Sequence, residues 1–215
     1  MKKETSIGHD IVVITIITLI AGLLLGLIHS ITAGPIAEQE EKTRIETQKA
    51  VFQSAASFEA IEGIEEDEAL IQAIADAGLT KTEVQAVDTA LDESGNPLGY
   101  VVTSMNKEGY GGEIKIMTGI DTTGEELSIN SIAFLTLAET AGMGMKADLP
   151  DFKDQFVDLK PGEDMVAYTK TGKSAPNEID AISGSTVTTS AVTKATNAAL
   201  VAVRYLEGGD RKSVM

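Results

Sequence analysis

The sequence contains no cysteine and no tryptophan, and only two of its 215 residues are histidine. Without cysteine the chain can form no disulfide, hold no thiolate-ligated iron–sulfur cluster and attach no c-type haem. The two imidazoles, His9 and His29, flank one hydrophobic run, so a histidine-based metal centre or a catalytic triad is not expected. If the chain carries out redox chemistry, an organic cofactor must supply it.

Basic residues are scarce as well. Lysine and arginine together number 17 against 33 aspartates and glutamates, which gives a net charge of −16. A nucleic acid is therefore not an expected partner, because the chain lacks a basic surface to displace phosphate counterions. The length suits one domain of ordinary size with an appendage.

The longest uncharged stretch lies near the N-terminus, where residues 11–28 are almost wholly apolar. Eighteen helical residues span ~27 Å, close to the hydrocarbon thickness of a bilayer. Lys2 and Lys3 precede this run, and acidic residues from Glu38 follow it. The positive-inside rule then predicts a single-pass anchor in the cell (inner) membrane, with a cytoplasmic N-terminus and the remainder outside. The alternative is a cleaved signal peptide, since residues 30–33 include small side chains.

The rest of the chain predicts an α+β domain with a mainly antiparallel sheet and flanking helices. Two helices come first, followed by strands joined by short turns, which favour antiparallel pairing of neighbours. The expected helices cover residues 37–57, 66–77, 151–157 and a C-terminal segment ending near Tyr205, and the expected strands cover residues 84–91, 98–105, 113–120, 127–135, 165–170 and 179–182.

One short stretch indicates a phosphate site. Ser183-Gly-Ser-Thr186 follows a β-prone run and precedes the C-terminal helical pattern. The first turn of a helix has unpaired N–H groups and the positive end of the dipole, so it can hold a phosphate. Gly184 allows close approach of the backbone, and Thr186 offers a hydroxyl that can be esterified. On the residues alone, a simple helix N-cap is the competing interpretation.

Three segments together resemble the FMN-binding domain family. They are residues 109–121, which begin Gly-Tyr-Gly-Gly, residues 139–144, Glu-Thr-Ala-Gly-Met-Gly, and residues 180–186, Asp-Ala-Ile-Ser-Gly-Ser-Thr. With its N-terminal span, the whole chain resembles the G subunits of Rnf electron-transport complexes, and it is similar to the C subunits of sodium-pumping NADH:quinone reductases.

The resemblance implies that a flavin transferase recognises the last motif and links FMN to Thr186 through a phosphoester. It also implies flavin contacts from the Glu-Thr-Ala-Gly-Met-Gly loop. This chain departs from the family pattern in three places, with Ser185 in place of alanine, Ala141 in place of proline and Met143 in place of leucine. The residues assigned to the cofactor or to the transferase motif are Asp180, Ser183, Gly184, Ser185, Thr186, Glu139, Thr140, Gly142, Met143 and Gly144.

The domain organisation expected from the sequence is an N-terminus and anchor over residues 1–31, a juxtamembrane helical segment over residues 32–82, and an FMN-binding domain over residues 83–215. The resemblance implies a membrane-anchored electron carrier with covalent FMN, working with other membrane subunits in an ion-translocating ferredoxin:NAD oxidoreductase. Such a protein is not expected to be catalytic alone. Two alternatives remain, a flavin subunit of an NADH:quinone reductase or a stand-alone extracytoplasmic flavoprotein. A noncatalytic anchored scaffold or solute-binding domain is the alternative from another class.

Overall fold

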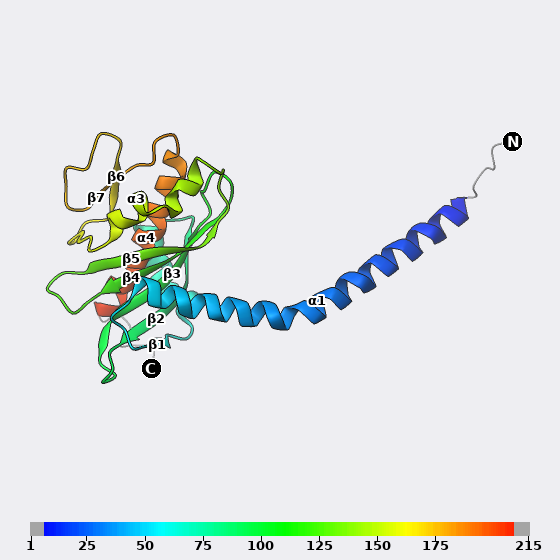
Figure 1. The fold of residues 1–215 in the computed structure, drawn as a ribbon, viewed down its shortest axis with the longest axis horizontal. Coiled ribbons are helices and arrows are strands. Elements are labelled where there is room, and N and C mark those ends of the chain that lie inside the picture. Colours follow the sequence, from blue (N-terminus) through cyan, green and yellow to red (C-terminus); the bar gives the residue numbers. More distant parts are fainter. Residues whose placement is uncertain (1–6, 209–215) are drawn as a thin grey trace. The chain divides into compact units, whose positions relative to one another are not determined.

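The computed structural model describes residues 7–208, and the chain divides into two compact units, Met1–Ile45 and Glu46–Met215. Helix α1, Ile7–Val51, begins in the first unit and ends in the second (Figure 1). Within the described residues, one helical stretch, Gly8–Gly34, is long and apolar enough to cross a bilayer, with a mean hydropathy of 3.0. This confirms the predicted N-terminal apolar helix, and it fits a single-pass membrane anchor.

The helix expected over residues 37–57 is not a separate element, because α1 runs without a break through Pro35 and ends at Val51. Its end is fixed by burial. Val51, Phe52 and Ala55 form a small core with residues of the sheet. A side chain at Gly119 would come within 2.2 Å of the Val51 carbonyl oxygen, so the absence of a side chain there lets the helix end lie directly on the sheet.

The sheet has five antiparallel strands in the order β1-β2-β3-β4-β5. They are β1 Ser57–Ala60, β2 Thr82–Leu91, β3 Pro97–Asn106, β4 Ile114–Asp121 and β5 Ser128–Leu137. The last four agree with the predicted strands to within two residues. Strand β1 was not predicted, since its four residues carry too little pattern. Strand β4 is buried along most of its length.

Helix α2, Glu68–Asp76, follows a short 3₁₀ turn, Ile64–Glu66, so the predicted helix over residues 66–77 is confirmed with a later start. Asp67 caps it by accepting hydrogen bonds from the N–H groups of Ala69 and Leu70, at 3.0 and 3.2 Å. The Tyr205 hydroxyl also donates to the Asp67 carboxylate at 3.0 Å. This contact joins α2 to the C-terminal helix.

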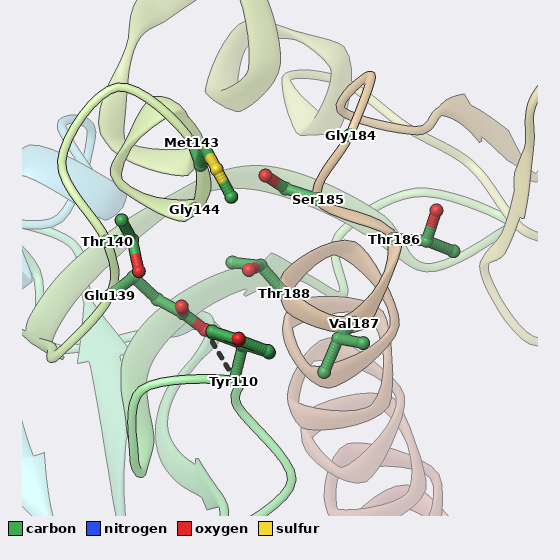
Figure 2. A pocket seen from close by; sticks show the side chains of 10 residues that line it. All are labelled: Tyr110, Glu139, Thr140, Met143, Gly144, Gly184, Ser185, Thr186, Val187 and Thr188. Carbon is green, nitrogen blue, oxygen red and sulfur yellow. Dashed lines mark hydrogen bonds between the residues drawn. The ribbon is translucent and has the colours of Figure 1, made fainter.

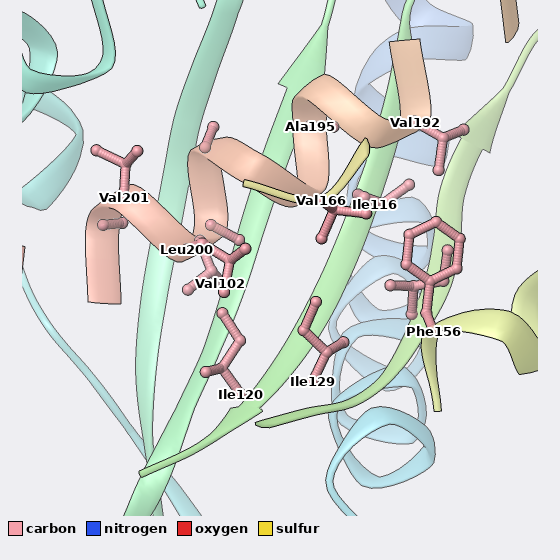
Figure 3. Close-up of a cluster of buried hydrophobic side chains, with 14 of the residues drawn as sticks. Val102, Ile116, Ile120, Ile129, Phe156, Val166, Val192, Ala195, Leu200 and Val201 are labelled. Carbon is pink, nitrogen blue, oxygen red and sulfur yellow. The ribbon is translucent and has the colours of Figure 1, made fainter. Parts of the chain in front are cut away.

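Helix α4, Thr186–Glu207, packs across one face of the sheet and forms the main core with it (Figure 3). Alanines at every turn, such as Ala195 and Ala199, let the helix approach closely, and both are fully buried. The Ser104 hydroxyl of β3 donates to the Ala195 carbonyl oxygen at 2.9 Å. Other members of this core are Val102, Ile116, Ile120, Ile129, Phe156, Val166, Val192 and Leu200.

The segment between β5 and α4 consists of short elements. They are a 3₁₀ turn at Gly144–Asp148, helix α3 at Pro150–Lys153, a second 3₁₀ turn at Asp154–Phe156, and strands β6 Ala167–Thr169 and β7 Glu178–Asp180. The single helix predicted over residues 151–157 is thus split into α3 and a 3₁₀ turn. Strands β6 and β7 pair in parallel as a separate two-stranded sheet. The predicted α+β class with a mainly antiparallel sheet is confirmed.

Candidate functional site

The turn before α4 has a specific hydrogen-bonded shape. Gly184 has a φ of +79°, in the left-handed region that favours glycine. The Ser185 N–H donates to the Ile182 carbonyl oxygen at 2.9 Å, and the Ile182 N–H donates to the Thr189 hydroxyl at 3.0 Å. The chain therefore leaves the small sheet and enters α4 along a fixed path, with Thr186 as the first helical residue.

The loop after β5 faces this turn. The Thr140 carbonyl oxygen accepts hydrogen bonds from the N–H groups of Met143 and Met145, at 3.1 and 3.2 Å. Glu139 joins this loop to the turn before β4, because its Oε1 accepts from the Tyr110 N–H at 2.9 Å (Figure 2). Gly144 is buried, and the side chains of Glu139 and Thr188 fill the space that a side chain there would need.

The two loops and the start of α4 enclose one cavity of about 360 Å³. Its size lies in the range of small-molecule sites. Figure 2 shows the loop of Met143 opposite the turn of Ser185, with α4 beginning between them and Tyr110. The lining residues are Tyr110, Glu139, Thr140, Met143, Gly144, Gly184, Ser185, Thr186, Val187 and Thr188.

Most of the predicted site residues therefore come together. Three of them do not line the cavity: Ser183, Gly142 and Asp180. Asp180 is held in the fold instead, because its carboxylate accepts from the Lys173 N–H at 2.8 Å and its own N–H donates to the Gln155 side chain at 2.6 Å.

Three lining residues were not named as site residues from the sequence, namely Tyr110, Val187 and Thr188. The glycine-rich segment around Tyr110 contributes to the resemblance to the FMN-binding domain family, but no site residue was predicted in it. The glycines on both sides of Tyr110 were the sequence feature that could have marked this position. The structure gives a reason for one of them, because a side chain at Gly111 would come within 2.1 Å of the Ala138 carbonyl oxygen. Glycines that permit close backbone approach often mark where two loops meet.

The cavity combines apolar walls with a few polar groups. Tyr110, Met143 and Val187 expose 74%, 47% and 49% of their surface, which is unusual for large apolar side chains that gather around one hollow. The buried hydroxyl of Ser185 has no hydrogen-bond partner among the residues that the structure describes. A flat aromatic ring with polar edges, carried on a phosphate that lies near a helix N-terminus, fits this set of groups.

Two carboxylates beyond the cavity, those of Glu108 and Glu178, are held by specific partners. Lys194, two turns along α4 from Thr186, forms an ion pair with Glu108, and Lys81 approaches the same carboxylate at 3.5 Å. The hydrogen bond from Lys194 is the main cause that holds the pKa of Glu108 below its usual value. Glu178 also has a lowered pKa, because the N–H groups of Ser174 and Ala175 donate to its carboxylate.

No group of three or more histidine, aspartate or glutamate side chains is placed to hold a metal ion within residues 7–208.

Comparison with known proteins gives a consistent result. The model of the FMN-binding domain family matches residues 109–201, a range that holds every residue of the cavity. The G subunit of the Na⁺-translocating ferredoxin:NAD⁺ oxidoreductase complex of Acetobacterium woodii is 32% identical over 203 residues, which cover 91% of this chain and 93% of that protein. The G subunit of the ion-translocating oxidoreductase complex of Methanosarcina acetivorans is 31% identical over 208 residues, which cover 97% of this chain and all of that protein.

Among solved structures, the C subunit of the Na⁺-translocating NADH-quinone reductase of Parabacteroides distasonis is similar, with a TM-score of 0.46 and 21% identity. The likeness covers 71% of this chain and 77% of that one.

Proposed function

Because this chain belongs to the family of G subunits of ion-translocating oxidoreductase complexes, we propose that it carries FMN bound covalently to Thr186. In this proposal it passes electrons between membrane subunits of a ferredoxin:NAD⁺ oxidoreductase. The observation that carries the proposal is the meeting of two sequence motifs at one cavity. The Glu139–Gly144 loop and the Ser183–Thr186 turn lie about 40 residues apart in the sequence. Residues of both line the cavity, and Figure 2 shows Met143 of the loop across from Ser185 of the turn.

Thr186 is well placed to form a phosphoester with FMN. It is half-buried, it stands at the first position of α4, and it contributes to the cavity wall. The N–H groups of Thr186, Val187 and Thr188 belong to the first helical turn, whose donors have no partner within the helix. A phosphodiester keeps one negative charge, which a helix N-terminus favours by about 0.3–1 kcal/mol. That energy is too small to retain a cofactor, so the ester bond is the element that holds it.

FMN supplies the capacity to accept and release one or two electrons. The chain's own residues shape the place where this happens. Met143 and Val187 offer apolar surface for a ring, and the Glu139 carboxylate fixes the loop of Tyr110 beside it. These surfaces would limit the access of water to a bound ring.

The apolar stretch Gly8–Gly34 confines the carrier to a membrane. We propose that the N-terminus with Lys2 and Lys3 lies in the cytoplasm and that the flavin domain, expected over residues 83–215, lies outside. A flavin transferase acts on the Asp180–Thr186 motif during maturation in this proposal. Other membrane subunits of the complex then donate electrons to the flavin and accept them from it.

Two other functions make different predictions. A flavin subunit of an NADH:quinone reductase would copurify with quinone-reducing partners rather than with a cysteine-rich ferredoxin-like protein. A noncatalytic scaffold would be colourless after expression with the transferase. The match to the FMN-binding domain family over the whole cavity favours the electron carrier over the scaffold.

The experiment expresses the full chain together with a flavin transferase and examines a denaturing gel under ultraviolet light. The wild-type band should be fluorescent, and Thr186→Ala should abolish the fluorescence. Thr171→Ala is the matched control, because Thr171 is an exposed threonine outside the cavity, and its band should remain fluorescent. A dark wild-type band, or a fluorescent Thr186→Ala band, overturns the assignment.

A further inference from the structure

Ser185 occupies the N-cap position of α4, but its side chain does not cap the helix. It is the residue before the first turn of α4, with φ −133° and ψ 48°, and its side chain makes no capping hydrogen bond. A serine in this place normally accepts from a free N–H of the first helical turn. Its hydroxyl points toward Met143 across the cavity instead (Figure 2).

Every other polar atom of Ser185 has a partner. Its N–H donates to the Ile182 carbonyl oxygen at 2.9 Å. Its carbonyl oxygen accepts from the N–H and from the hydroxyl of Thr189, both at 3.0 Å. The residue is only 7% exposed, and among residues 7–208 nothing bonds to its Oγ. Leaving a buried hydroxyl unpaired is costly, so a partner from outside the chain is the natural explanation.

The surrounding groups indicate what that partner is. Figure 2 shows the thioether of Met143, a weak acceptor, on the facing side of the cavity. Glu139 is already bonded to the Tyr110 N–H. A hydroxyl has one proton to donate, and the edge of an isoalloxazine ring presents carbonyl oxygens and ring nitrogens that accept. The cavity that Ser185 lines is the one that the proposed function assigns to the flavin.

Resting on that function, we propose that the Ser185 hydroxyl donates a hydrogen bond to an acceptor on the isoalloxazine ring and thereby raises the reduction potential of the flavin. Reduction places electron density on the ring's oxygen and nitrogen acceptors. A hydrogen bond to a charged acceptor is about twice as strong as one to a neutral acceptor. The bond from Ser185 therefore stabilises the reduced flavin more than the oxidised flavin. Ser185 acts as a positioning and tuning residue and takes part in no chemical step.

The test measures the midpoint potential of the flavinylated full chain in detergent by titration with dithionite, which supplies the electrons. Intact mass first establishes that each variant carries flavin. In Ser185→Ala we expect the equilibrium constant for one-electron reduction to fall about tenfold, a shift of ~59 mV to lower potential. Ser185→Thr keeps the hydroxyl, so its potential should stay close to that of the wild type. Ser131→Ala is the control, because this half-buried serine of β5 does not line the cavity, and its potential should equal that of the wild type.

A second measurement separates this role from a structural one. Without flavin, Ser185→Ala should melt at the same temperature as the wild type or higher, since the change removes a buried hydroxyl that has no protein partner. A helix cap would behave in the opposite way, and its loss would lower the melting temperature. A lower melting temperature for this variant overturns the proposal.

The two proposals fail differently. If wild-type chain takes up no flavin with the transferase present, the carrier function is wrong and the tuning role falls with it. If flavin is attached to Thr186 but the equilibrium constants for one-electron reduction of Ser185→Ala and wild type differ by less than twofold, only the role of Ser185 is wrong.

Discussion

Replacing Gly144 by alanine tests the packing that joins the two walls of the cavity. A methyl group at this position would come within 2.7 Å of the Glu139 Oε2, 2.8 Å of the Glu139 Cβ and 2.7 Å of the Thr188 Oγ1. Only the Oε2 can swing away easily. The Cβ and the short Thr188 side chain are close to their backbones, so the loop of Glu139 must move away from α4.

The size of the effect follows from two losses. Overpacking of a close contact costs about 1–3 kcal/mol. Moving Glu139 also weakens its bond to the Tyr110 N–H, now 2.9 Å long. For a half-exposed carboxylate that bond contributes about 1 kcal/mol. Gly144→Ala should therefore destabilise the domain by about 2–4 kcal/mol, which lowers the melting temperature by roughly 4–16 °C for a unit of this size.

The assay is thermal unfolding of the full chain without flavin, with Gly124→Ala as the matched control. At Gly124 the added methyl group would meet only the Glu126 backbone, at 3.4 and 3.9 Å, so stability should be unchanged or slightly higher. The double variant Gly144→Ala with Glu139→Ala should lose less than the sum of the single losses, because the first change already displaces the carboxylate. A melting temperature within about 2 °C of wild type for Gly144→Ala, or strictly additive losses, would show that Gly144 does not join the two walls in this way.

Three further predictions concern the elements that support the site. Asn197→Ala should cost about 2–5 kcal/mol in denaturant unfolding, because the buried Asn197 amide bonds both the N–H and the carbonyl oxygen of Val166, at 2.8 and 2.9 Å; a loss below about 1 kcal/mol would contradict this. Gly119→Ala should release the end of α1 from the sheet, since its methyl group would come within 2.2 Å of the Val51 carbonyl oxygen, and amide exchange over residues 48–55 should accelerate; unchanged protection would be evidence against this contact. Lys194→Met should reduce stability at pH 7 by less than about 1 kcal/mol, as expected for a partly exposed pair. The pKa of Glu108 is lowered in the folded state, so its stabilisation is present above the unfolded pKa of about 4.3 and is lost as the pH falls through the lower folded value. The difference between variant and wild type should therefore disappear in acid, and a difference that grows in acid would exclude this ion pair as its cause.

The sheet was predictable because its strands follow one another through short turns. Turn residues such as Asp92 stand between the strands. The Asp92 carboxylate, between β2 and β3, accepts from the Ser94 and Asn96 N–H groups at 2.7 and 2.8 Å. Such local hydrogen bonds leave a signal in the sequence. Strand β1 left none, because its four residues exist as a strand only through pairing with β2.

The parallel pairing of β6 with β7 and the path of α1 depend on distant contacts. Residues 167–169 and 178–180 are too short to indicate a partner by pattern. The end of α1 is set by Phe52, which is completely buried against the sheet. A sequence shows that Phe52 is apolar but does not show which surface covers it.

The candidate site was predictable where motif and geometry coincide. The Ser-Gly-Ser-Thr turn and the loop of Glu139 were both identified, and the structure brings them to one cavity. Thr188 was missed because it enters the cavity from the third position of α4, a place that reads as ordinary helix. The role of Asp180 in recognition by the transferase stays a prediction, and within the fold this residue holds the segment before the turn.

We propose that the hydroxyl of Thr186 carries flavin phosphate. Intact mass spectrometry of the purified full chain, after expression with the transferase, tests it most directly. We expect a mass increase equal to one FMN less one water, localised by peptide mapping to Thr186 and absent from Thr186→Ala. An unmodified wild-type chain, or an adduct on another residue, would contradict it.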